Sequence, residues 1–208
     1  MSLTFEDFGG RLASVWSELR PTTRGLVERA LQTTVQNTAR GSSPASAPYD
    51  ARADHELSKL LSALDERASE TDSKLEADKE SQLQQMADAC ASVLQEKSRS
   101  AEVFAQLVQR ADDRRDYKRI DSLADVLMAF APSEVCELAR SAHVVVRALA
   151  NEALAQFPAP ALVGLLNDPV DAAIARDALR RKALDYGSEE ARQILNVISQ
   201  NDLVGDDY

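Results

Sequence analysis

Apolar residues recur at three- and four-residue spacing along most of the chain, a pattern typical of amphipathic α-helices. At the N-terminus this pattern predicts a pair of helices over residues 1–37, separated at Pro21 because proline interrupts a helix. Thr22 or Thr23 is expected to cap the second helix. The apolar face of the first helix comprises Phe5, Phe8, Leu12, Val15, Trp16 and Leu19.

The periodic pattern stops in residues 38–52, where Gly, Ser, Pro and Ala dominate. This composition is typical of a flexible linker. We therefore predict that the N-terminal pair is a tethered docking element. Phe5, Phe8, Leu12 and Trp16 would form its contact face, on either a partner or the same chain.

A long segment without helix breakers follows the linker. No proline occurs between Pro48 and Pro132, and no glycine between Gly41 and Gly164. Good helix formers dominate this segment, so residues 53–111 are predicted to form one helix roughly 90 Å long, within a 53–116 domain.

Two apolar seams lie along this predicted helix at the spacing of a coiled coil. A helix too long for one small core to cover would expose them, so we expect the chain to form a homo-oligomer through this helix. The self-association residues are Leu57, Leu61, Leu64, Leu83, Met86 and Val93.

An alternative to the continuous helix stays open. Ser69–Ser73 is a run of poor helix formers. A turn at this run would convert the rod into an antiparallel helical hairpin of half the length.

The pattern changes after the charged residues 112–119, where a break or hinge is expected. Shorter helices with clear proline, glycine and capping signals occupy residues 117–200, and an acidic tail occupies 201–208. The short helices are related to one another: a shift of 27 residues superimposes Phe130 on Phe157 and Leu138 on Leu165.

This repeated segment resembles HEAT-like helical repeats over residues 118–200. The resemblance is carried by a turn with Asp and Pro that leads into a helix with a Val/Ile–Arg pattern. It implies stacked helical hairpins and a binding surface for other proteins. The matching residues are Asp168, Pro169, Ile174 and Arg176, with Val146 and Arg147 one unit earlier.

Charge and hydropathy limit the classes of partner. The net charge is -10, and residues 120–208 hold fourteen acidic and seven basic groups. An acidic chain is poorly suited to nucleic acid or anionic membranes, so neither is an expected partner. The sequence has neither a signal peptide pattern nor a membrane-spanning apolar run, and we expect a cytoplasmic protein.

No motif for catalysis, a cofactor or a metal is recognised in the sequence. His55 and His143 lack further ligands at metal-binding spacing. Cys90 and Cys136 lie on apolar helical faces and are expected to be buried thiols. We therefore predict that the chain is not an enzyme and needs no cofactor.

Two basic clusters are candidate binding sites. The first lies within residues 110–119, where interleaved aspartates favour a solvated, salt-bridged hinge. In the second, Arg176 and Arg180 lie one turn apart and could bind the acidic tail or an acidic partner. Asp177 and Asp185 lie four residues on either side of Arg181 and could pair with it.

The sequence thus predicts an all-α protein with a long, coiled-coil-like helix and a small stack of HEAT-like hairpins. The expected function is a non-enzymatic scaffold or adaptor that binds proteins and self-associates. Two alternatives stay open: a membrane-surface protein that uses the N-terminal helix, and an enzyme with a helical fold.

Overall fold

The computed structural model describes residues 5–35, 49–70 and 76–205. Within these residues the chain is all-α, with eleven α-helices, two short 3₁₀ helices and no strand, as predicted. The chain divides into two compact units, Met1–Ser98 and Arg99–Tyr208.

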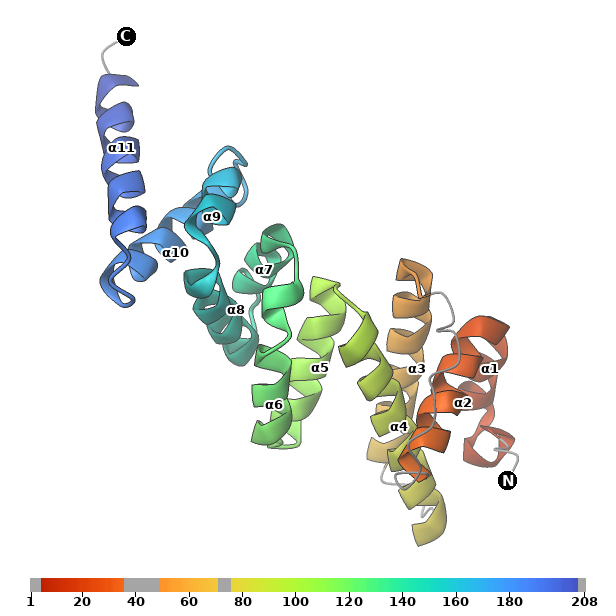
Figure 1. The fold of residues 1–208 in the computed structure, drawn as a ribbon. Helices are drawn as coiled ribbons and strands as arrows, with labels where there is room; N and C mark the ends of the chain where they lie inside the picture. The colour runs from red at the N-terminus through yellow and green to blue at the C-terminus, as the bar shows by residue number, and fades with distance from the viewer. Residues whose placement is uncertain (1–4, 36–48, 71–75, 206–208) are drawn as a thin grey trace. The chain divides into compact units, whose positions relative to one another are not determined.

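Unit 1 is a bundle in which α3 packs along α4, α1 covers α3, and α2 covers α4 (Figure 1). Its elements are η1 (Phe5–Phe8), α1 (Gly10–Glu18), α2 (Pro21–Val35), α3 (Ala51–Ser69) and α4 (Ala77–Lys97).

The prediction of one continuous helix over residues 53–111 is wrong. Three helices occupy this segment: α3, α4 and α5 (Ala101–Asp113). α3 ends at Ser69, inside the run of poor helix formers, and α4 returns along it, as in the hairpin alternative. The hairpin is favoured because it buries both apolar seams, which a single rod would leave in water.

Contacts inside the hairpin show that its helices are antiparallel. The thiol of Cys90, about two thirds of the way along α4, lies 3.3 Å from the carbonyl oxygen of Leu57, about one third of the way along α3. The seam residues are at most 8% exposed and form the core of unit 1: Leu57, Leu61, Leu64, Leu83, Met86 and Val93.

The break between α4 and α5 was not predicted. Residues 98–100 leave the helical path, and the carboxylate of Glu134 accepts a 2.8 Å hydrogen bond from the first backbone N–H of α5. Because α5 packs on α6, α7 and α8, it belongs to unit 2. The predicted domain boundary after residue 116 therefore moves to Ser98.

The predicted linker is too long at its C-terminal end. α3 begins at Ala51, where the Asp50 carboxylate caps it by accepting a 2.9 Å hydrogen bond from the N–H of Ala53. Residues 38–48 of the predicted linker lie outside the described residues.

Arg20 clamps the α1–α2 junction to the start of α3. Its guanidinium donates two hydrogen bonds to Asp50, at 3.0 and 2.7 Å, and one to Glu56 at 2.9 Å. Thr23 lies inside α2, so it is not the cap that was predicted, and its hydroxyl donates to Glu56. The N-terminal pair is therefore held to its own unit by charge-assisted hydrogen bonds as well as by apolar packing.

The clamp lowers the pKa values of both carboxylates. The hydrogen bond from Arg20 lowers the pKa of Asp50 from 3.8 to about 2. Burial raises the pKa of Glu56, but hydrogen bonds from Thr23 and Arg20 outweigh burial and leave it below its ordinary 4.5. Both groups therefore bind protons less readily in the folded state than in the unfolded state.

Unit 2 is a series of helical pairs in which α5 packs on α6, α7 on α8, and α9 on α10, with α11 against α10 (Figure 1). Its remaining elements are α6 (Tyr117–Ala124), η2 (Leu127–Ala129), α7 (Pro132–Ala139), α8 (Val144–Gln156), α9 (Ala159–Leu165), α10 (Ala172–Leu184) and α11 (Glu189–Gly205).

The repeated phenylalanines occupy matching places in this series. Phe130 follows η2 and precedes Pro132, while Phe157 follows α8 and precedes Pro158, and both rings are buried. Phe130 also meets the ring of Phe104 edge to face at 5.6 Å. The pairs are thus related units, while the likeness to HEAT repeats stays a prediction.

We expect unit 1 to lose stability as the pH falls from about 4.5 towards 2, the range in which Glu56 and Asp50 take up protons. Above this range both carboxylates are ionised and contribute fully to the stability of unit 1. Thermal unfolding monitored by circular dichroism should show that Arg20→Gln lowers Tm near neutral pH and that the difference from the parent chain shrinks in acid.

Arg11→Gln is the matched control, because it removes an exposed ion pair between α1 and α3, Arg11–Glu66. Its Tm should stay close to that of the parent at every pH. If Arg20→Gln lowers Tm by the same amount at pH 6 and at pH 2.5, the ion pairs of Arg20 with Asp50 and Glu56 do not stabilise unit 1 as inferred.

Phe157→Ala should lower the free energy of unfolding by about 3–5 kcal/mol, because it leaves a cavity where a buried ring packs. Urea denaturation measures this cost. Leu184→Ala should change stability by less than about 0.5 kcal/mol, since Leu184 is exposed. Equal effects from the two substitutions would show that the ring contributes no core packing.

Candidate protein-binding surface

The predicted N-terminal contact face packs within unit 1. Phe5, Phe8 and Leu12 are buried, and the half-buried ring of Trp16 stacks on Phe5 at 4.0 Å. Arg67 on α3 donates a 2.7 Å hydrogen bond to the carbonyl of Phe8. This is the self-packing alternative, and docking on a partner or membrane through this face would require η1 and α1 to leave α3.

The six predicted self-association residues are also internal, because they form the α3–α4 core described above. Self-association through them would require the hairpin to open. The apolar seams that were predicted to join two chains therefore pack against each other within one chain.

The predicted pair Arg176 and Arg180 does not form one open cationic face. Arg180 is exposed and pairs with Asp177 at 2.8 Å, whereas Arg176 is half-buried. Arg181 pairs with Asp185 at 3.8 Å, as predicted, and with Glu152 at 3.4 Å, but not with Asp177. Docking of the acidic tail is not tested, since the side chains of residues 201–208 lie outside those described.

Neither histidine lies in a metal-ligand group. Among the described residues no cluster of three or more His, Cys, Asp or Glu side chains could hold a metal ion. Cys90 and Cys136 are free and buried, as predicted. Burial raises the pKa of Cys136 to about 11, so its thiol stays protonated at neutral pH.

Exposed large apolar side chains of the described residues all lie in unit 2. The described part of unit 1 has none, because its four helices cover one another. The exposed residues are Tyr117, Met128, Val144, Val163, Val170, Leu184, Tyr186 and Val197.

Three of these residues lie on successive turns between paired helices. Tyr117 follows the α5–α6 turn, Val144 follows the α7–α8 turn, and Val170 lies in the α9–α10 turn, with 64%, 67% and 62% of their surfaces exposed. They are spaced 27 and 26 residues apart in the sequence. Each repeated unit therefore exposes one apolar side chain near the start of its second helix: Tyr117 and Val144 are the first residues of α6 and α8, and Val170 lies two residues before α10.

Polar contacts join these turns into a row. His143 Nε2, next to Val144, lies 3.4 Å from the Asp112 carboxylate at the end of α5. Arg140 at the end of α7 pairs at 2.5 Å with Asp171, next to Val170, and the Asp171 side chain is only 7% exposed. We call Tyr117, Val144 and Val170 with these turns the turn ridge.

The first turn of the ridge is basic and conformationally strained. Arg115 has a φ of 55°, in the left-handed region that non-glycine residues avoid. Two 2.9 Å backbone hydrogen bonds, from Arg115 to Asp112 and from Asp116 to Ala111, close this turn. Arg115 and Lys118 are exposed beside Tyr117 and give this end of the ridge positive charge.

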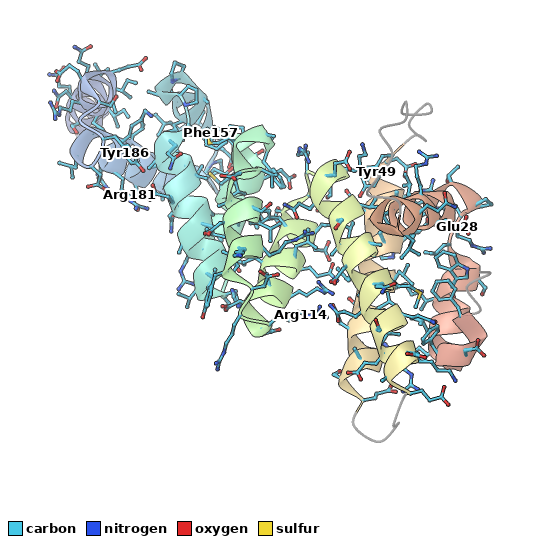
Figure 2. All side chains as sticks on the ribbon, turned by 60° about the horizontal axis from the view of Figure 1, so that its bottom comes forward. Glu28, Tyr49, Arg114, Phe157, Arg181 and Tyr186 are labelled. Atoms are coloured by element: carbon cyan, nitrogen blue, oxygen red, sulfur yellow. The ribbon has the colours of Figure 1, made fainter. Side chains whose placement is uncertain are left out.

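A further polar group joins α8 to α10. Glu152 on α8 accepts hydrogen bonds from the Tyr186 hydroxyl, from Gln156 at 3.1 Å and from Arg181 at 3.4 Å. The bond from Tyr186 lowers the pKa of Glu152. Figure 2 shows Tyr186 and Arg181 close together, and this contact fixes the end of α10 against α8.

Sequence reasoning did not assign the ridge residues to a binding site, because none of them belongs to the apolar stripes that helical periodicity picks out. The available signal was their spacing of 27 and 26 residues, which is close to the 27-residue shift that relates the phenylalanines.

No family model, no curated protein and no solved structure matches the chain. Within the described residues, none of the helices is long and apolar enough to cross a membrane.

Arg115→Gly should stabilise unit 2 by roughly 1 kcal/mol relative to Arg115→Ala, because glycine adopts a positive φ without a Cβ clash. Both variants lose the Arg side chain, so their difference isolates the backbone strain. Urea unfolding measures it.

Arg114→Gly is the control at the neighbouring position, where the backbone is right-handed. It should be less stable than Arg114→Ala. If the Gly variant is less stable than the Ala variant at position 115 as well as at position 114, the turn at Arg115 is not strained.

Proposed function

We propose that the chain is a non-enzymatic protein-binding scaffold or adaptor, and that the turn ridge of unit 2 is its binding surface. The observation that carries this proposal is the exposure of one large apolar side chain on each of three linked turns. Exposed apolar surface of this kind marks interaction sites. Arrays of helical repeats use extended surfaces to bind proteins, and the HEAT-like resemblance points the same way.

The size of the ridge favours reversible binding. Full burial of a Val-sized side chain contributes about 1.5–3 kcal/mol, and the three residues are already partly covered. The ridge alone therefore supports an affinity between roughly millimolar and micromolar, where about 4 to 8 kcal/mol is needed. Such a surface suits a scaffold that binds through several contacts at once.

The buried N-terminal face makes the membrane-surface alternative less favourable. Of the aromatic side chains that would insert into lipid, Phe5 and Phe8 are buried within unit 1 and Trp16 is half-buried against Phe5, and the chain is acidic. The enzyme alternative has no observation in its favour among the described residues, and the absence of activity stays a prediction.

A triple variant of the full chain, Tyr117→Ser with Val144→Thr and Val170→Thr, tests the proposal. Tagged parent and variant chains are used to capture proteins from a lysate of the source organism, and each captured protein is quantified by mass spectrometry. At least one protein enriched by the parent should fall roughly tenfold or more with the variant, a loss of about 1.4 kcal/mol.

Met128→Thr with Val163→Thr is the matched control, because it reduces exposed apolar surface of unit 2 away from the ridge turns. It should leave the captured set unchanged. If the triple variant folds and captures the same proteins at the same level as the parent, the ridge is not the binding surface.

A further inference from the structure

The last helix of the described chain, α11, is covered far less than the helices before it. Its main contact is with α10. Four side chains of α10 are buried, namely Ala175, Ala178, Leu179 and Ala183, whereas Ala191 is the single buried side chain among residues 189–200. Helices α5–α10 form three pairs. α11 packs on α10, which already belongs to the α9–α10 pair, and no further helix pairs with α11 among the described residues.

The apolar side chains of α11 are only partly covered, although most of its fully exposed residues are polar. Ile194, Leu195 and Ile198 are only half-buried. Val197 beside them is 57% exposed, and Leu184 at the end of α10 is 79% exposed. An amphipathic helix normally buries such a stripe against another element.

The segment of the chain that carries this stripe is acidic. Residues 185–208 contain six acidic side chains and one basic side chain, a net charge of -5 out of -10 for the whole chain. Glu190 is exposed one helical turn before Ile194 and two turns before Val197, so it lies along the same side of α11. Residues 193–201 between the charged ends carry no charge.

We infer that this face of α11 binds an amphipathic helix of a partner protein whose apolar stripe is flanked by lysine or arginine. The inference rests on the proposed protein-binding function and adds a second surface with a defined partner chemistry. The partner helix packs along Ile194, Val197 and Ile198 and supplies the second helix that α11 lacks. Its basic residues lie opposite Glu190.

A second copy of the chain is a poorer occupant of this face. Pairing of two α11 helices would bring two segments of net charge -5 together, and like charges across an interface disfavour association. A basic helix instead gains from the same charges, and its binding should weaken as salt screens them.

Two labelled synthetic helical peptides test the inference against the full chain by fluorescence anisotropy. Both carry the same leucine stripe, and their polar positions are lysine in one and glutamate in the other. The lysine peptide should bind at least about tenfold more tightly at low salt, and this preference should shrink as salt is added.

Variants of α11 locate the site. Val197→Glu changes an exposed residue and should reduce binding of the lysine peptide by roughly tenfold or more. Glu190→Lys should weaken the lysine peptide and strengthen the glutamate peptide. A merely structural role of Glu190 would not invert this preference, and circular dichroism checks that both variants keep their helix content.

The turn-ridge triple variant is the control and should bind the lysine peptide as the parent does. The inference is overturned if neither peptide binds, if both bind equally, or if Glu190→Lys leaves the preference unchanged. Sedimentation that shows a dimer of the parent, abolished by Val197→Glu, would assign the face to a second copy instead. If the peptides fail while the ridge variant still loses captured proteins, the proposed function stands without this site.

Discussion

The structure depends on burying the apolar stripes of short helices away from water. Most described helices bury one apolar stripe against a neighbour, and a central helix such as α4 buries a wider face against both α2 and α3. The α3–α4 hairpin shows the consequence most directly. Its leucine seams are separated along the sequence, and they meet only because the chain reverses between Ser69 and Ala77.

Polar contacts then determine how the packed elements are held. In unit 1, Arg20 ties the α1–α2 junction to Asp50 and Glu56 at the start of α3. In unit 2, the pair Arg140–Asp171 links the turns of successive helical pairs, with its carboxylate buried. Small side chains fill much of the α8 and α10 faces, which lets these helices approach closely. Apolar packing among such small residues is weakly directional, so specific hydrogen bonds contribute to the choice of register.

The two units differ in how much apolar surface they leave exposed. Unit 1 closes on itself, since its described part exposes no large apolar side chain. Unit 2 is a series of pairs whose turns and last helix stay accessible, and both proposed surfaces lie there. The turn ridge arises from repetition of one exposed position, and the α11 face arises where the series lacks a second helix among the described residues. A role in holding proteins together is consistent with both features.

The sequence by itself determined the all-α class and most of the helices after residue 117. Pro158 and Gly187 mark helix ends, and the Ser188 hydroxyl caps α11 by accepting a hydrogen bond from the N–H of Ala191. Local signals suffice for these features because a cap or a breaker acts on its own backbone. The Asp168 turn lies before α10 rather than at its first residue, and its carboxylate accepts from the N–H of Val170.

The tertiary structure alone decided which helix each stripe meets. A leucine seam has the same spacing whether its partner is another chain or the next helix, so the pattern around Leu57 could not distinguish an oligomer from a hairpin. The break at residues 98–100 depends on Glu134, which is distant in sequence and caps α5 only in the folded chain. The binding surfaces could not be predicted from hydrophobic periodicity either, because the exposure of Val144 or Val197 depends on which neighbouring helices cover them.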